Sequence, residues 1–182
     1  MAVSEKTAIR RDKWKRRILE IIRNTPNASR IVVKRASGLS MDSTLGLIDE
    51  LLQDGLIATI GKSDDGKVGR KTTLLKINPD GCYFIGVRFS AAGVTGACMD
   101  FERQLVCACG GELPRRPDAR DMIEAVCGCI SELIDRMGER RERLRGIGIG
   151  APGLIDLNRG VISRYVHIPD WENVPLPETV GQ

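Results

Sequence analysis

The chain has 182 residues, 42% of them hydrophobic and 29% charged, a composition typical of a globular protein with one or two domains. No apolar run approaches the ~20 residues of a membrane span. The charged N-terminus is not followed by the apolar core of a secretory signal. A cytoplasmic location with no membrane partner is therefore expected. The net charge of +4 is unevenly distributed along the chain. Residues 1–76 carry 16 Lys and Arg against 9 Asp and Glu (+7), and residues 77–182 carry 12 against 15 (−3). The basic first part therefore has either a phosphate-binding surface or a solvated basic face.

Two short helices are predicted at the start of the chain. Apolar residues at helical spacing, from Trp14 to Ile22, indicate a first helix over about residues 12–24, which the segment Asn24-Thr-Pro-Asn27 ends. Ser29 is a candidate N-cap for a second helix, and Gly38 suits the turn after it because glycine adopts positive φ at little cost. The side chains expected to be buried on the second helix are Ile31, Val32 and Ala36.

A third helix follows the candidate N-cap Ser40 and ends at Gly55, which fits the first position after a helix. Its expected core face is Leu45, Ile48, Leu51 and Leu52. The residues near its N-terminus occupy the positions from which a recognition helix reaches base edges in the major groove. These candidate DNA-binding residues are Ser40, Met41, Asp42, Ser43 and Thr44.

A hairpin is predicted next, with strands over residues 56–60 and 73–77. The polar, Gly-rich loop between them carries Lys67, Arg70 and Lys71, which suit a wing that rests on phosphates or enters the minor groove. An ordinary surface hairpin is the alternative. Two helices joined by a tight turn and followed by a basic hairpin form the layout of a winged helix-turn-helix. Residues 1–77 are therefore predicted to bind double-stranded DNA, and a homodimer is expected because such readers usually bind two half-sites.

Residues 78–182 have a different pattern. Apolar strands are predicted over residues 83–89, 93–101 and 104–109, then a helix capped by Asp118, a strand over 145–150 and a hairpin through 158–160. The predicted buried face of the helix is Met122, Ile123, Val126, Ile130, Leu133, Ile134 and Met137. This βββαβ order suggests half of an α/β domain.

Several stretches resemble the ROK family (repressors, open reading frames and sugar kinases). GLSMDSTLGLIDELLQDGLI resembles the family's helix-turn-helix, GKVGRKTTLLKINPD its wing, and YFIGVRFSAAGVTGACMDF the first hairpin of its actin-like domain. GIGIGAPGLIDLNRGVI and HIPDWENVPL resemble the next stretches of its sugar-binding lobe. The resemblance implies a mixed α+β and α/β fold. A winged helix-turn-helix over residues 1–77 precedes an incomplete actin-like lobe of the sugar-kinase or Hsp70 type over residues 78–182.

The chain departs from the family's kinases at their phosphate turn, Asp-x-Gly-Gly-Thr-Lys. Residues 88–93 here are Arg-Phe-Ser-Ala-Ala-Gly, so a cation replaces the acid, and Cβ atoms would crowd a phosphate. The family's catalytic Asp and zinc-binding cluster would lie beyond Gln182. We therefore expect no catalytic residue, no metal ligand and no cofactor in this sequence.

The resemblance places two residues near the family's sugar cleft, Gly153 and His167, and both are candidate ligand-binding residues. His167 stands where the family usually has Asn, and a surface or packing role is the alternative. The sequence thus predicts a DNA-binding transcriptional regulator, a repressor of sugar-utilisation genes, with a degenerate and truncated lobe for a small-molecule sugar. The alternatives are a fragment of an ATP-dependent sugar kinase and a DNA-binding module without a ligand response.

The chain contains six cysteines, including Cys107-Ala-Cys109 and Cys127-Gly-Cys129. Cys107 and Cys109 would share one face of a strand, whereas Cys127 and Cys129 would diverge by about 200° on a helix. Buried structural thiols are expected in preference to a metal site. Disulfides are not expected in a cytosolic chain.

Overall fold

The structure is a computed structural model that describes residues 2–62, 72–90, 92–156, 158–165, 168 and 171–175. It divides into two compact units, Met1–Gly81 and Cys82–Gln182, a few residues after the boundary expected from the sequence. Asn78 accounts for the difference, because its backbone amide donates to Leu56 O (3.0 Å) and its side chain to Gly55 O (2.7 Å), which holds the turn η1 (Pro79–Gly81) against the first unit. None of the helices in the described ranges is long and apolar enough to cross a membrane.

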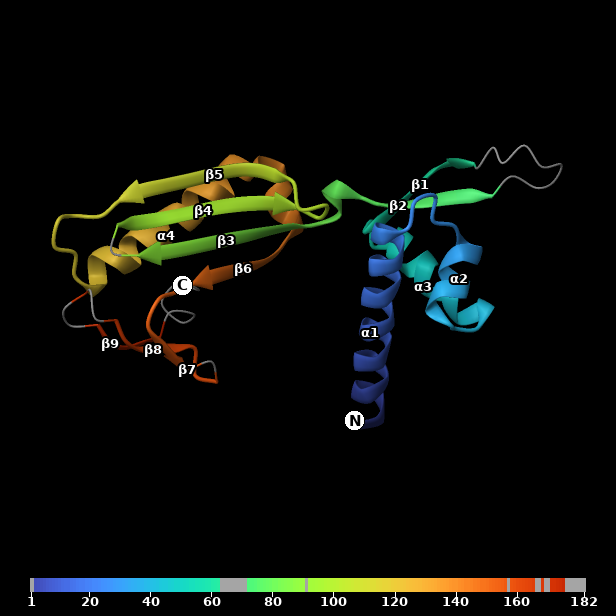
Figure 1. The fold of residues 1–182 in the computed structure, drawn as a ribbon, viewed down its shortest axis with the longest axis horizontal. Helices are drawn as coiled ribbons and strands as arrows, with labels where there is room; N and C mark the ends of the chain where they lie inside the picture. Colours follow the sequence, from blue (N-terminus) through green and yellow to red (C-terminus); the bar gives the residue numbers. More distant parts are fainter. Residues whose placement is uncertain are drawn as a thin grey trace. The chain divides into compact units, whose positions relative to one another are not determined.

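The described part of the first unit contains three helices followed by an antiparallel hairpin (Figure 1). Their bounds are α1 (Ala2–Asn24), α2 (Arg30–Ser37), α3 (Met41–Gln53), β1 (Ile57–Lys62) and β2 (Thr73–Ile77). The helices and the hairpin enclose one apolar core, whose members include Ile18, Ile22, Val33, Ile48, Leu51, Ile57 and Leu75. The hairpin also joins the helical part through the backbone, since Leu75 N donates to Ala28 O at 2.8 Å.

The caps of α2 and the end of α3 confirm the sequence predictions. Ser29 caps α2 by accepting a hydrogen bond from Val32 N (3.3 Å), and Gly38 follows α2 in the left-handed conformation at φ 74°. After α3, Gly55 also has positive φ (69°), and its N–H donates to Leu52 O while Leu56 N donates to Leu51 O. This pair of bonds is the Schellman motif, which satisfies the last carbonyls of the helix.

The sequence placed the start of α1 and the buried face of α2 wrongly. Helix α1 begins at Ala2 instead of about residue 12, because residues 2–11 contain no Gly or Pro to break a helix, and Arg11 pairs with Glu50 of α3. On α2 the buried residue is Val33, while Ile31 is 47% exposed and Ala36 is exposed. A helix of eight residues offers too few turns for periodicity to decide which of three consecutive apolar side chains faces the core.

The core face of α3 is Thr44, Leu47, Ile48 and Leu51, whereas the predicted Leu45 and Leu52 are only half-buried. Thr44 is fully buried because its hydroxyl has a partner within the helix, donating to Ser40 O at 2.8 Å. A satisfied polar side chain thus occupies a core position that a hydrophobic pattern does not reveal.

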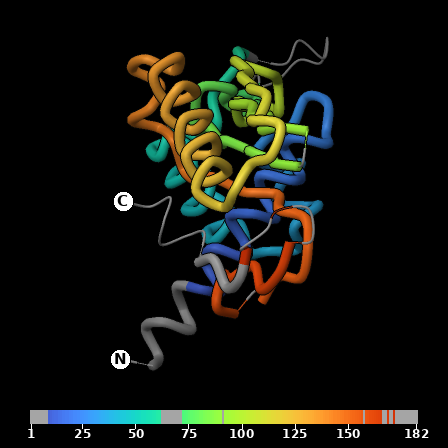
Figure 2. Tube along the Cα trace, turned by 90° about the vertical axis from the view of Figure 1, so that its left-hand side faces the viewer, coloured from blue at the N-terminus to red at the C-terminus, as the bar shows by residue number. Residues whose placement is uncertain are grey.

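The second unit contains the predicted βββαβ order. Its first part comprises β3 (Tyr83–Ser90), β4 (Gly93–Asp100), β5 (Leu105–Glu112), α4 (Ala119–Met137), η2 (Gly138–Arg143) and β6 (Leu144–Gly150). The strands form a sheet in the order β5-β4-β3-β6, in which β6 is parallel to β3 and the other pairs are antiparallel. Helix α4, with the predicted N-cap Asp118 in a capping box, covers one face of this sheet (Figures 1 and 2).

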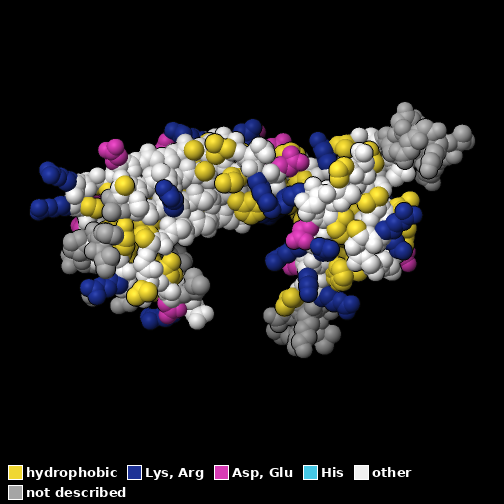
Figure 3. All heavy atoms as spheres, viewed as in Figure 1, with side chains coloured by type: hydrophobic (Ala, Val, Ile, Leu, Met, Phe, Trp, Pro, Cys, Tyr) yellow, Lys and Arg dark blue, Asp and Glu magenta, His cyan; other side chains and the backbone are white. Residues whose placement is uncertain are grey.

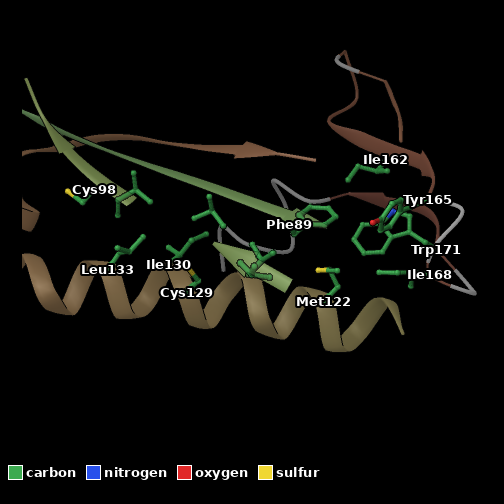
Figure 4. Packing of buried hydrophobic residues seen from close by; sticks show 14 of the residues in the cluster. Phe89, Cys98, Met122, Cys129, Ile130, Leu133, Ile162, Tyr165, Ile168 and Trp171 are labelled. Atoms are coloured by element: carbon green, nitrogen blue, oxygen red, sulfur yellow. The ribbon is translucent and has the colours of Figure 1, made fainter. Parts of the chain in front are cut away.

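A small second sheet follows, made of β7 (Leu154–Asp156), β8 (Val161–Arg164) and β9 (Glu172–Pro175). The predicted hairpin through residues 158–160 joins β7 to β8, and Asp156 Oδ1 accepts bonds from the amides of Asn158 and Arg159. After β8, Tyr165 and Trp171 pack with Phe89 of β3 at ring-centroid distances of 5.5–6.2 Å (Figure 4). This aromatic cluster continues the core beneath α4 into the C-terminal segment.

The expectation that no disulfide forms is wrong in this structure. Cys109 of β5 and Cys129 of α4 are joined, with their Cα atoms 6.2 Å apart. The cysteine pairs that are apparent in the sequence are two residues apart. The bonded pair is separated by 20 positions and meets because α4 packs across β5. Among the described residues, no group of three or more His, Cys, Asp or Glu side chains is arranged so that it could hold a metal ion.

Candidate nucleic-acid interface

The N-terminal turn of α3 is the exposed part of the predicted recognition helix. The Ser40 side chain accepts a bond from Ser43 N (3.3 Å) and donates to Ser43 Oγ (2.9 Å), which confirms the predicted cap. Met41 is 42% exposed, and Asp42 and Ser43 are exposed beside it. This turn therefore presents a thioether, a carboxylate and a hydroxyl to the surroundings.

Thr44 must be removed from the predicted base-reading residues. It points into the core with 0% exposure, and its hydroxyl is committed to Ser40 O. Its backbone amide also donates to Ser40 O at 3.0 Å. Thr44 thus fixes the first turn of α3 from the inside and does not belong to the exposed surface.

Ion pairs attach α1 to the C-terminal half of α3. Arg11 pairs with Glu50, and Lys15 Nζ lies 3.0 Å from a carboxylate oxygen of each of Glu50 and Asp54. Exposed pairs of this kind contribute ~0–1 kcal/mol each, so their main effect here is to set the position of α1 beside α3. Two of the cations of α1 are therefore paired with carboxylates within the protein.

Arg10 and its neighbour Arg11 line the same hollow beside α3, but Arg11 is paired with Glu50 and Arg10 is not. A hollow of about 500 Å³ between α1 and α3 is lined by Arg10 and Trp14 on one side and by Asp42, Ser43 and Gly46 on the other. Arg10 is exposed, and it makes no ion pair with the described side chains. Figure 3 shows Lys and Arg side chains gathered over α1 and α2. Arg10 thus places a cation beside the first turn of α3, which contains no Lys or Arg.

Sequence reasoning missed Arg10 because it started the first helix at about residue 12. A usable signal was present, since Arg10 precedes Trp14 by four residues and nothing between them interrupts a helix. The predicted wing residues Lys67, Arg70 and Lys71 lie outside the described residues. The strands that flank them, β1 and β2, are paired as predicted, with Ile57 opposite Ile77.

In the second unit, Arg88 lies at the end of β3 where the family's kinases have an acidic residue. Its Nε donates to Thr95 Oγ1 at 3.3 Å, and its side chain borders a hollow of about 410 Å³ that Gly86, Gly148 and Gly150 also line. Gly93, at φ 149°, closes the turn to β4, and a Cβ there would collide with Gly111 O. A guanidinium, not a carboxylate, therefore faces this end of the sheet.

Of the two predicted ligand-binding residues, Gly153 is described and His167 lies outside the described residues. Gly153 has φ 102°, and a Cβ at this position would collide with Arg164 O of the neighbouring strand β8. Close backbone approach thus accounts for glycine here without a ligand.

A solved structure shares this arrangement of helices and sheets. It is a ROK family transcriptional regulator, a homologue of the Escherichia coli Mlc protein, and it matches 94% of this chain and 43% of its own chain with a TM-score of 0.73 at 21% identity. The fold of the chain is therefore the mixed α/β fold of a ROK regulator.

Two relatives in sequence that cover most of the chain are repressors. The chain is 26% identical to the DNA-binding transcriptional repressor Mlc of Escherichia coli K12 over 154 residues, 85% of this chain and 38% of Mlc. It is 25% identical to the xylose repressor of Bacillus spizizenii over 183 aligned positions, 100% of this chain and 46% of that protein. These homologues confirm the predicted resemblance to the ROK family, and the chain spans less than half the length of either relative. No family model matches the chain.

Proposed function

We propose that the first unit is a winged helix-turn-helix that binds double-stranded DNA, and that the chain is part of a transcriptional repressor of sugar-utilisation genes. The observation that carries this proposal is the exposed, serine-capped first turn of α3, which lies on a basic unit and presents Met41, Asp42 and Ser43. The names of the two reported relatives support it, since Mlc is a DNA-binding transcriptional repressor and the Bacillus spizizenii protein is a xylose repressor.

Within this proposal the residues have separate tasks. Met41, Asp42 and Ser43 contact base edges, and Ser40 holds the turn in shape as its N-cap. Because this turn contains no Lys or Arg, the bidentate guanine contact has to come from elsewhere. Arg10 supplies a cation from α1 beside the same turn, and the wing residues Lys67, Arg70 and Lys71 contact phosphates. The proposed assembly is a homodimer on two half-sites.

The second unit is proposed to be a partial actin-like lobe that senses a sugar and does not phosphorylate it. Arg88 supports this assignment, because a guanidinium at the end of β3 cannot take part in holding a metal–nucleotide complex as a carboxylate would. Gly153 and His167 remain proposed ligand-binding residues, and no residue is proposed as catalytic. The alternatives are a fragment of a sugar kinase and a DNA-binding module that does not respond to sugar.

The proposal is tested by selecting duplexes from a random pool with the full chain and titrating a selected duplex at several salt concentrations. The proposal expects an enriched sequence and a linear fall of log K with log salt, as phosphate contacts require. A sugar panel that changes the affinity supports the sensor assignment, and no change favours the non-responsive module. Failure to enrich any sequence would overturn DNA reading, and sugar-dependent ATP consumption would favour the kinase.

Neutralising Asp42 should strengthen DNA binding and change the preferred base at one position. The carboxylate repels nearby phosphates and accepts only from donors such as cytosine N4, whereas an Asn side chain both donates and accepts. We expect Asp42→Asn to bind the selected duplex a few-fold more tightly and to enrich a different base in a repeated selection. Asp12→Asn, at an exposed position of α1 where the described side chains form no ion pair with Asp12, is the control for removing one negative charge. Equal effects of the two variants would show that Asp42 contacts no base.

A further inference from the structure

Four cysteines lie together where β4, β5 and α4 meet. Cys98 of β4 is opposite Cys107 of β5 in the sheet register, and Cys109, two residues along β5, is bonded to Cys129 of α4. The Cα separation of the bonded pair, 6.2 Å, lies within the range that a disulfide spans without backbone movement. Figure 4 shows Cys98 and Cys129 in the layer between the sheet and the helix.

The sheet leaves room for the Cys129 sulfur at one particular position. Gly96 of β4 is directly opposite Cys109, and a Cβ on Gly96 would lie 2.6 Å from Cys129 Sγ and 2.9 Å from Leu133 Cδ1. Any side chain at Gly96 would therefore displace the helix cysteine from the strand cysteine. The glycine provides the space in which the two sulfurs meet.

The neighbouring thiols differ from this pair in reactivity. Burial, with a smaller contribution from Cys107, raises the pKa of Cys98 to about 11, so Cys98 stays protonated near neutral pH and is a poor nucleophile. Cys127 is one of the cysteines not in the disulfide, and on α4 it diverges from Cys129. Cys107 is half-buried and shares the strand face of Cys109, so it is the competitor that an experiment must exclude.

The two bonded cysteines differ in exposure. Cys109 is half-buried on β5, which is an edge strand of the four-stranded sheet, whereas Cys129 is only 7% exposed. Cys109 is the more exposed residue of the pair, so its sulfur is assigned as the one that first exchanges with a small thiol or disulfide. This asymmetry is the arrangement of an attacking and a resolving cysteine.

We propose that Cys109 and Cys129 are a reversible redox site that exchanges with a low-molecular-weight thiol–disulfide couple. In the oxidation, the Cys109 thiolate attacks one sulfur of the small disulfide, breaks its S–S bond, releases one small thiol and leaves a mixed disulfide on Cys109. The Cys129 thiolate then attacks the Cys109 sulfur and releases the second small thiol. The two protein thiols lose two electrons and two protons, and the small disulfide gains them. The product bond connects the edge strand to the helix.

The test uses the full chain equilibrated with glutathione mixtures from fully reduced to fully oxidised. The reaction is quenched with acid, and the thiols are alkylated in denaturant and mapped by mass spectrometry. The proposal expects a single internal bond, Cys109 to Cys129, whose fraction follows the ratio of the couple and reverses on reduction. It also expects the melting temperature of the second unit to fall by about 10 °C on reduction. Cys127→Ser should keep that shift, whereas Cys109→Ser and Cys129→Ser should lose it.

Three results would overturn the proposal. The first is full alkylation of all six cysteines in the oxidised mixture. The second is a bond that involves Cys107, which Cys107→Ser would then abolish. The third is a bond between two copies of the chain on a non-reducing gel. Because the wild-type map alone decides these outcomes, the test stands even if a serine variant does not fold.

Discussion

Replacing Trp171 by Ala is expected to destabilise the second unit by about 3–5 kcal/mol, the usual cost of removing a large buried aromatic side chain. Trp171 is 1% exposed and lies 5.5 Å from the Phe89 ring and 6.1 Å from the Tyr165 ring, measured between centroids. The substitution would leave a cavity where the C-terminal segment meets β3. Hydrogen exchange of the β3 amides in increasing urea measures the free energy of opening for this unit.

Leu154→Ala is the matched control, because Leu154 on β7 is 72% exposed and its truncation should change stability by no more than about 0.5 kcal/mol. Amides of α3 in the first unit should keep their protection in both variants. If Trp171→Ala and Leu154→Ala have equal effects, the aromatic cluster does not hold the C-terminal segment to the sheet.

Replacing Arg10 by Ala should weaken binding to the selected duplex about tenfold, since one cation that reaches the DNA is lost. Arg10 lines the same hollow as Asp42 and Ser43, and the first turn of α3 contains no Lys or Arg of its own. The salt dependence should become shallower by about 0.9 if Arg10 neutralises a phosphate. A changed base preference with an unchanged slope would instead indicate that Arg10 reads a base. Fluorescence anisotropy at several salt concentrations, with a repeated selection, separates the two contacts.

Arg17→Ala provides the comparison, because Arg17 is also exposed on α1 but pairs with Glu20 and does not line the hollow beside α3. It should change the affinity less than twofold. Circular dichroism should show equal helix content in the two variants, since neither side chain is in the core. Similar losses for both would mean that α1 acts only through its overall charge.

Local chemistry explains what the sequence predicted well. The caps Ser29, Ser40 and Asp118 and the terminator Gly55 act through bonds within a few residues, so their types and spacing suffice to place the helix ends. The βββαβ order of the second unit follows from strand and helix periodicities in the same way.

Properties that depend on distant parts of the chain were predicted poorly. Thr44 is buried because other elements pack over that side of α3, and a hydrophobic pattern does not assign a core position to a hydroxyl side chain. Ile31 is exposed because the side of α2 that meets α1, α3 and β2 carries Val33 instead. The Cys109–Cys129 pair and the hollow beside Arg10 each require two elements to be packed together before they exist.

The first turn of α3 maintains the fold and, under the proposed function, also contacts the DNA bases. These two roles together restrict which substitutions are able to change operator preference. Ser40 caps the helix with its hydroxyl and accepts the Thr44 hydroxyl with its carbonyl oxygen, so these two positions maintain the fold. Substituting a cap serine by Ala costs roughly 0.5–2 kcal/mol, which limits variation at position 40. Under the proposed function, the three consecutive positions 41–43 are left to diverge among paralogues or in a designed library. New operators should therefore be reached through Met41, Asp42 and Ser43, with Ser40 and Thr44 kept.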